Sequence, residues 1–507
     1  MHASIQEAIN SATRLKKRTC NCITTLHFSY FQRSLLLLQK VVAMLEFNSI
    51  TSNKFSTSLL LVFMALITST FFMILMHFVS LKRQQKVFLV DFACYKPSPS
   101  ESISKDTTSQ RAKLTGFHTD ETIQFMRMLM DKAGLSDFTY LPENLTRVPY
   151  EMSLVSARRE TEKVMFGAID ELLAKTKVQV QDIGILIVNC SLFQEVPSFT
   201  SAIVNHYKLR DTIASYSLGG MGCSCGLVAI GLVKQLLKVH PNTNAIVVST
   251  ENISGQYYRG NDRSKVVVNG LFRLGGAAIL LSNKPSDQKT SKYQLIHTVQ
   301  THTASSDTSY RCIFQEEDDS GLVGVTINKD LLVSAAEVIK LNLTSLGPLI
   351  LPLSEQYLFL KNVIARKILK SRNVEKFIPN FSKGIDHFFP HVGGKPVLDD
   401  LQNKLGFSDL AMEASRMTLY RFGNTSSSSV WYALAYAEAK GRIKKGDLLW
   451  QMAFGSGFKC SSVIWRANKL VEFEESNPWS DEIHQYPQNL DDIQAITQEE
   501  YYLEPTK

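Results

Sequence analysis

Short stretches of almost continuous apolar residues mark the first half of the chain. They occupy 183–188, 245–249 and 276–282. Runs of this length are typical of strands that are buried on both faces of a sheet. Two other stretches, 121–133 and 154–175, repeat their apolar positions with helical spacing. The pattern therefore predicts strands alternating with helices, which favours a parallel α/β architecture.

The second half of the chain repeats this succession in outline. Strands are predicted at 295–301, 323–327, 384–388, 448–454 and 461–466, and helices at 329–343, 429–440 and directly after His391. The identity between the two halves is too low to prove a duplication from sequence. One apolar run with two prolines, 346–353, resembles a shallow membrane segment, but its length favours a buried or substrate-facing loop.

The longest apolar run differs from all of these. Residues 55–81 contain no Asp, Glu, Lys or Arg, and about 20 apolar residues suffice to cross a bilayer. The run is too long and starts too late for a cleaved signal peptide, which leaves a buried core helix as the alternative. Lys82, Arg83 and Lys86 follow it, which favours a cytosolic position for the body. A shorter run at 34–47 is too charged to predict a second span.

The net charge of +8 is unevenly distributed. Residues 1–40 hold six Lys and Arg against one Glu, so we expect 1–54 to be a basic arm that suits anionic lipid head groups. Nucleic acid would be the rival partner, but no zinc spacing or alternation of aromatic and basic residues supports it. The eight cysteines are scattered and indicate neither a disulfide framework nor a metal site, which fits a reducing compartment.

One cysteine stands out by its surroundings. Cys223 follows three glycines, Gly219, Gly220 and Gly222, and precedes an apolar helix. The glycines allow a sharp turn and the approach of a substrate. A helix N-terminus favours the thiolate, the form that attacks thioesters. The alternative is a structural cysteine beside a tight packing turn.

Three later motifs support a catalytic interpretation. They are His391-Val392-Gly393-Gly394, the loop from Arg421 to Ser429 that contains Asn424, and Gly455-Ser456-Gly457. A Cys, a His and an Asn in this order, each beside small residues, resemble the thiolase-like condensing enzymes. The runs 89–97, 188–193, 260–264 and 351–356 resemble the plant 3-ketoacyl-CoA synthases, and the resemblance extends from Val87 to Pro487.

This resemblance implies a fold, a reaction and a location. The fold would be the five-layer, internally duplicated thiolase-like α/β fold, preceded by the membrane anchor at 55–81. Its halves would be 87–292 and 293–470, with a polar tail at 471–507. The enzyme would condense malonyl-CoA with a long-chain acyl-CoA to a 3-oxoacyl-CoA, the first step of very-long-chain fatty acid elongation. It would lie in the endoplasmic reticulum membrane, as a homodimer associated with the elongase reductase and dehydratase, and would need neither metal nor cofactor.

The resemblance also assigns roles in the site. Cys223 would be the nucleophile, and His391 would activate it and then donate to the enolate oxygen beside the amide of Asn424. Gly455 and Gly457 would present a backbone N–H to the acyl oxyanion, although glycines serve packing equally well. His302 and His387 are secondary candidates that match family histidines.

Some positions depart from the family pattern. Tyr420 replaces a histidine, and Cys225 replaces a small alanine. These departures keep open a non-catalytic family member that binds and modulates the elongase. A soluble polyketide synthase would lack 55–81, and a degradative thiolase would use a second cysteine, for which Cys460 is available. Acyl chain length and saturation preference are not encoded in any motif.

Overall fold

The computed structural model describes residues 64, 68, 69, 85–368, 374, 375 and 377–490. It divides the chain into two units, 1–84 and 85–507. Apart from three helical residues, Met64, Thr68 and Ser69, the predicted arm and membrane segment lie outside the described residues. The following paragraphs concern the second unit.

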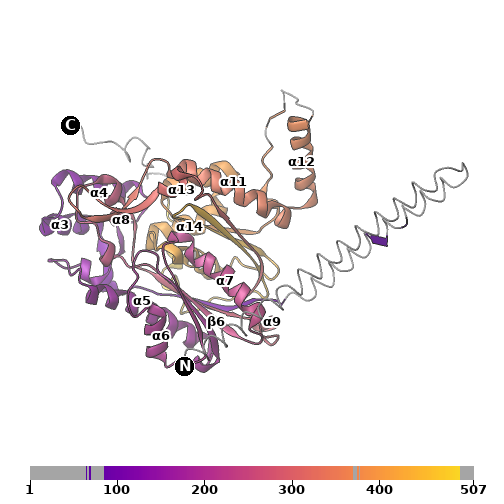
Figure 1. Cartoon of the computed structure of the whole chain (residues 1–507), viewed down its shortest axis with the longest axis horizontal. Coiled ribbons are helices and arrows are strands. Elements are labelled where there is room, and N and C mark those ends of the chain that lie inside the picture. Colours follow the sequence, from indigo (N-terminus) through magenta and orange to yellow (C-terminus); the bar gives the residue numbers. More distant parts are fainter. Residues whose placement is uncertain (1–63, 65–67, 70–84, 369–373, 376, 491–507) are drawn as a thin grey trace, which may run out of the picture. The chain divides into compact units, whose positions relative to one another are not determined.

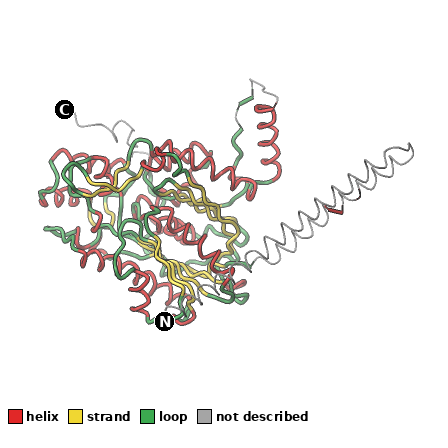
Figure 2. Tube along the Cα trace, in the orientation of Figure 1, coloured by secondary structure: helices red, strands yellow, loops and turns green. Residues whose placement is uncertain are grey.

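A nine-stranded sheet forms the centre of this unit, and Figure 2 shows it in yellow. Its strands are β1 (Phe88–Cys94), β4 (Ile183–Asn189), β5 (Ala214–Leu218), β6 (Asn244–Thr250), β7 (Gly276–Ser282), β8 (Tyr293–His302), β11 (His387–Pro390), β12 (Leu448–Gly455) and β13 (Lys459–Ala467). Their order is β11-β12-β13-β8-β1-β7-β6-β4-β5. The central strands β4, β6 and β7 are buried at every position, as their apolar runs predict.

The strand directions show that the two halves share one topology. In the first half, β4 is parallel to β6, while β6–β7 and β7–β1 are antiparallel. In the second half, β11 is parallel to β12, while β12–β13 and β13–β8 are antiparallel. Pairing of Phe88 with Gln294 joins the two half-sheets. The duplication that was only outlined in the sequence is therefore present in the fold.

Helices cover both half-sheets and fill the space between them. Their bounds are α3 (Lys105–Thr115), α4 (Asp120–Lys132), α5 (Leu154–Thr176), α6 (Phe199–Tyr207), α7 (Cys225–Val239), α8 (Arg263–Leu271), α9 (Asp287–Thr290), α10 (Asp307–Arg311), α11 (Leu331–Ile350), α12 (Leu353–Val363), α13 (Lys395–Leu405), α14 (Asp409–Phe422) and α15 (Ser429–Ala439). Both α7 and α15 contact strands of both halves, whereas α5 and α6 pack on the first half and α11 and α14 on the second. The result is five layers, with α7 in the middle of the unit (Figure 1).

The composition of α7 follows from this central position. Among the described residues, Gly222–Val239 is the helical stretch that is long and apolar enough to cross a membrane. Its side chains Leu227, Ile230 and Val233 are at most 1% exposed and pack in the core that both half-sheets share. Core packing therefore accounts for the apolar character of this helix.

Three sequence predictions need correction. The strand at 323–327 exists as β10, but it pairs with β9 (Ile313–Glu317) in a separate hairpin instead of the main sheet. The strand predicted at 384–388 is β11, shifted to His387–Pro390. The run 346–353 is no loop, because α11 continues through Pro348 to Ile350 and α12 begins at Leu353. A further small sheet pairs β2 (Ser102–Ser104) with β3 (Phe138–Tyr140).

Candidate active site

The nucleophile turn lies between β5 and α7. Cys223 is the middle residue of a single 3-10 turn, Gly222–Ser224, and is partly exposed. Gly222 has a φ of +59°, and a Cβ there would lie 2.7 Å from the backbone nitrogen of Ser456. A Cβ on Gly455 would overlap the carbonyl oxygen of Met221. The nucleophile turn and the 455–457 loop are therefore in backbone contact, which only glycine allows at these two positions.

Asn424 follows the end of α14. Its backbone carbonyl accepts a hydrogen bond from the amide of Arg273 (2.9 Å), and its side-chain oxygen accepts one from the amide of Ser426 (2.9 Å). The backbone donor fixes which side-chain atom is the oxygen. In the described part of the chain, the side-chain NH₂ of Asn424 donates no hydrogen bond, so it remains a donor for a ligand.

His391 directly follows β11 and is 4% exposed. Its amide donates to the carbonyl oxygen of Met452 (2.7 Å), which continues the β11–β12 pairing. Burial lowers the pKa of the imidazole to about 3, so the ring is neutral at physiological pH. Its Nδ1 is buried and has no hydrogen-bond partner among the residues that the structure describes. Among the described residues, no carboxylate bonds the His391 ring, so the packing of the surrounding residues determines its orientation.

A single cavity of about 300 Å³ joins these three side chains. One end carries Cys223, His391 and Asn424, and the Gly455 and Gly457 loop borders it. Cys223 follows β5, His391 follows β11, and Gly455 ends β12. The site therefore lies at the carboxyl ends of parallel strands, where α/β sheets commonly bind ligands.

Much of the remaining cavity wall is apolar. It comes from α8, the β9–β10 hairpin and the first turns of α11. The lining side chains are Val268, Leu271, Phe272, Ile313, Phe314, Val325, Ile327, Leu331, Leu332 and Ala335. An apolar chain attached to a reactive carbonyl fits this combination of one polar end and a long apolar wall.

The thiol of Cys223 is less acidic than its helix position predicts. Burial raises its pKa to about 12, the hydroxyl of Ser426 lowers it, and the charge of Glu251 raises it further. The dipole of α7 favours the thiolate, but desolvation outweighs it here. In the free protein Cys223 and His391 are thus a neutral thiol and a neutral imidazole.

Sequence reasoning missed a buried carboxylate behind the nucleophile. Glu251 is 3% exposed and accepts hydrogen bonds from the amide of Leu192 (2.9 Å) and the hydroxyl of Ser426 (3.0 Å). The Ser426 hydroxyl also lies 3.7 Å from the sulfur of Cys223. Ser426 has a φ of +57°, a conformation that only surrounding contacts maintain in a serine. A charged residue two positions after the predicted strand 245–249 was the signal that could have found Glu251.

The two secondary histidines lie outside this cavity. His387 begins β11, and its Nε2 is 2.9 Å from the Oδ2 of Asp447. His302 ends β8 and is exposed, and a Cβ on Gly457 would lie 3.6 Å from its Cε1. His302 thus borders the outer side of the glycine loop, whereas His387 has a partner at the opposite end of its strand from His391.

Tyr420 and Cys225, the two departures from the family pattern, do not line the cavity. Tyr420 lies on α14 and its ring packs against Tyr486, with a centroid distance of 6.5 Å. Cys225 and Cys460 are both fully buried and do not line the cavity. Because Cys460 does not line the cavity, it is not placed to act as the second catalytic cysteine of a degradative thiolase.

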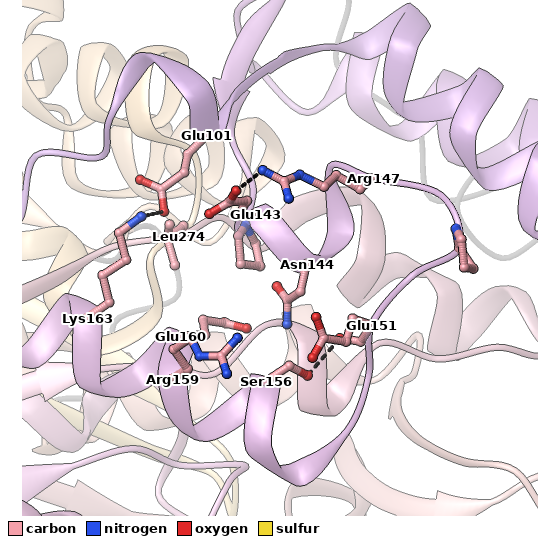
Figure 3. A pocket seen from close by; sticks show the side chains of 12 residues that line it. Glu101, Glu143, Asn144, Arg147, Glu151, Ser156, Arg159, Glu160, Lys163 and Leu274 are labelled. Atoms are coloured by element: carbon pink, nitrogen blue, oxygen red, sulfur yellow. Dashed lines mark hydrogen bonds and ion pairs between the residues drawn. The ribbon is translucent and has the colours of Figure 1, made fainter.

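A second cavity, of about 250 Å³, is charged and lies between α5 and the 142–151 loop. Figure 3 shows that two of its three cations pair with acids within the cavity: Lys163 bonds Glu101, and Arg147 bonds Glu143. Glu160 lies at its base and accepts hydrogen bonds from the amides of Ile253 (2.6 Å) and Ser254 (3.2 Å). This carboxylate therefore fixes the segment that follows Glu251.

Comparisons with known proteins find relatives over most of the chain. The family model described as FAE1/Type III polyketide synthase-like protein matches residues 79–368, and that of the 3-oxoacyl-(acyl-carrier-protein) synthase III C terminal matches 382–467. The protein named 3-ketoacyl-CoA synthase 11, from Arabidopsis thaliana, is 53% identical over 85% of this chain and 84% of its own length. The probable 3-ketoacyl-CoA synthase 20 of Oryza sativa subsp. japonica is 48% identical over 83% of this chain and 81% of its own.

Solved structures show the same fold at low identity. The C-terminal type III polyketide synthase domain of Steely1 from Dictyostelium aligns with a TM-score of 0.57 at 18% identity, over 75% of this chain and 99% of that domain. The 1,3,6,8-tetrahydroxynaphthalene synthase of Streptomyces coelicolor aligns with a TM-score of 0.56 at 19% identity, over 75% of this chain and 99% of that chain. These similarities support the duplicated α/β fold.

Proposed function

The chain belongs to the plant 3-ketoacyl-CoA synthases, and from this membership and its site geometry we propose that it condenses malonyl-CoA with a long-chain acyl-CoA. The product is a 3-oxoacyl-CoA two carbons longer, the first intermediate of very-long-chain fatty acid elongation. The observation that carries this proposal is the single cavity in which Cys223, His391 and Asn424 meet a long apolar wall.

The first half-reaction loads the acyl group. The sulfur of Cys223 attacks the thioester carbonyl while its proton passes to the neutral imidazole of His391, so no charged pair is needed beforehand. The CoA thiolate leaves and takes up that proton as free CoA. Backbone N–H groups of the nucleophile turn and of the 455–457 loop supply donors for the oxyanion, because the two loops are in contact.

The second half-reaction forms the carbon–carbon bond. Malonyl-CoA loses its carboxylate as CO₂, and the electron pair of the broken bond becomes an enolate. A neutral imidazole of His391 and the NH₂ of Asn424 both donate hydrogen bonds, which suits stabilisation of the enolate oxygen. The enolate carbon attacks the acyl carbonyl, and the thiolate of Cys223 leaves and takes up one proton from solvent. Apart from this proton, the chemistry uses groups of the chain and of the two substrates.

Location and assembly form part of the proposal. The uncharged run 55–81 anchors the chain in the endoplasmic reticulum membrane, with the basic arm on anionic lipid and the body on the cytosolic side. The strand β5 lies at one edge of the sheet and is exposed at its central positions. An unpaired edge of this kind suits pairing with a second copy, so a homodimer is proposed, in association with the elongase reductase and dehydratase.

Elongation by microsomes from a eukaryotic host that expresses the chain tests the activity. Labelled malonyl-CoA and acyl-CoAs of several lengths are supplied to the wild type, to Cys223→Ala and to Cys225→Ala. We expect new products two carbons longer in the wild type, their loss in Cys223→Ala, and their retention in Cys225→Ala, because Cys225 does not line the cavity. Absence of products above the empty-vector level, with folded protein in the membrane fraction, would contradict the proposed function.

A further inference from the structure

Helix α12 carries an exposed apolar stripe. Leu353, Tyr357, Leu360 and Ile364 are 82%, 65%, 56% and 38% exposed. Their spacing of four, three and four residues places them on one face of the helix and the turn that continues it. Contiguous apolar surface of this kind marks an interaction site in a folded protein.

The opposite face of α12 is held by polar contacts. Glu355 is 2% exposed and accepts hydrogen bonds from the amide of Asn380 (3.0 Å) and the Nζ of Lys383 (2.6 Å). Asn362 bonds the amide of Phe377 (3.2 Å) and the carbonyl of Glu375 (2.8 Å). The segment that returns from the helix therefore covers one side only. Figure 1 shows α12 projecting beyond the helices that cover the sheet, which leaves the apolar stripe uncovered within the second unit.

Positive charge accompanies the stripe. Lys361 and Arg366 are exposed at the end of α12 and in the turn after it. In the sequence from 361 to 376 there are six cations and one acid, Glu375. Helices that lie in the interface of an anionic bilayer combine apolar side chains with neighbouring Lys and Arg.

We propose that this face of α12, formed by Leu353, Tyr357, Leu360 and Ile364 with Lys361 and Arg366, docks on an anionic phospholipid bilayer. At 11 residues α12 is only about 16 Å long, which is too short to span a bilayer, so it lies in the interface. A second copy of the chain fits the stripe less well, because two such faces would bring their cations together.

The docking surface is connected to the active-site cavity by one helix. The first turns of α11 contribute Leu331 and Ala335 to the apolar wall, and the other end of α11 leads through Leu351 and Pro352 into α12. Acyl chains of the substrate class proposed above partition into lipid. A bilayer contact at α12 would therefore hold the acyl-binding wall near the phase in which these chains accumulate.

Photo-cross-linking of the full chain in nanodiscs tests this contact. The nanodiscs contain phosphatidylcholine and labelled phosphatidylserine, and p-benzoylphenylalanine replaces either Tyr357 or Leu410. Leu410 is 64% exposed at the start of α14 and is the matched control. We expect a labelled lipid adduct at position 357 and none at 410. Equal adducts at both positions, or an adduct only to a second copy of the chain, would overturn the proposal.

The charge requirement is tested in the same system. Lys361→Glu combined with Arg366→Glu is expected to abolish the adduct at position 357, as is 1 M salt, which shortens the Debye length to about 3 Å. An unchanged yield would overturn the choice of an anionic partner. Both residues are exposed, and the alkylation rate of Cys223 checks that the variant remains folded. The cross-link needs no turnover, so its outcome is separate from that of the condensation assay.

Discussion

At the residue scale, the chemistry depends on two groups that burial keeps uncharged. The thiol of Cys223 has a pKa of about 12 and the imidazole of His391 one of about 3. Between these values neither group carries charge, so activation requires proton transfer at the moment of attack. Glu251 works against ionisation of Cys223, since its negative charge raises the pKa of the thiol.

Replacing Glu251 tests this electrostatic effect. Glu251→Gln keeps an oxygen for the hydroxyl of Ser426 but removes the charge, so we expect a lower pKa for Cys223. The rate of its alkylation by iodoacetamide, followed against pH by mass spectrometry, should rise at lower pH than in the wild type. A Cys225→Ala background removes the neighbouring thiol, whose pKa is also raised to about 12 by burial. Superimposable rate profiles would show that Glu251 does not control the nucleophile.

At the element scale, the site depends on contact between loops from the two halves. Gly222 and Gly220 have φ values of +59° and +67°, but only a Cβ on Gly222 would meet the 455–457 loop, while a Cβ on Gly220 would meet nothing within 4 Å. Each Gly→Ala substitution costs about 1–2 kcal/mol of backbone strain. Only the Gly222→Ala side chain also pushes the two loops apart.

Gly220→Ala is therefore the matched control for Gly222→Ala. We expect both variants to lower the thermal unfolding midpoint, and Gly222→Ala to lower it further and to slow acylation of Cys223 by acyl-CoA. Intact mass spectrometry of the acyl-enzyme measures the second effect. Equal acylation rates in the two variants would mean that loop contact does not position the nucleophile.

Individual strands and helices show how much of the fold can be predicted from the sequence. The strand at 276–282 was predicted with its observed bounds, because its apolar run allows one interpretation. The pattern at 323–327 also predicted a strand, but periodicity does not say which sheet a strand joins. The run 346–353 was wrongly predicted as a loop, since a proline inside a helix is tolerated here at Pro348.

The residues of the candidate site also fall into two groups, those that the sequence predicts and those that only the structure reveals. Cys223, His391 and Asn424 could be predicted because their motifs, taken in order, resemble those of the thiolase-like condensing enzymes. Glu251 and Ser426 are 175 residues apart and meet only in the fold. No local sequence pattern encodes a pair of this kind, so the contact between Glu251 and Ser426 could be identified only from the structure.

At the scale of the whole molecule, the apolar cavity wall sets the room for the acyl chain. Ala335 lines the cavity on α11, whereas Val333, two residues earlier, is 65% exposed and does not line it. We expect Ala335→Phe to shift microsomal elongation toward shorter products, because the added ring occupies the cavity. Val333→Phe should leave the product profile unchanged, and gas chromatography of the fatty acids measures both. An unaltered profile in Ala335→Phe would place the acyl chain elsewhere.

The stability of the whole fold should respond to one buried acid. Burial raises the pKa of Glu160 from 4.5 to about 7, although amides of Ile253 and Ser254 favour the ionised form. A raised pKa means that the folded state binds the proton more tightly than the unfolded state. The stabilisation is therefore complete below about pH 4.5 and is lost as the pH rises through about 7.

Glu160→Gln removes this titration and keeps one of the two side-chain oxygens, so it preserves the acceptor of one amide and replaces that of the other by an NH₂ group. We expect the unfolding free energy of the wild type to fall relative to that of the variant between pH 5 and pH 8, by up to roughly 3 kcal/mol. Denaturant titrations in one detergent at several pH values measure the difference. A constant difference across this range would show that Glu160 does not change its protonation on unfolding. If the unfolding free energy of the wild type falls relative to that of the variant, Glu160, which holds the segment after Glu251, is neutral in the folded state where the protein is most stable.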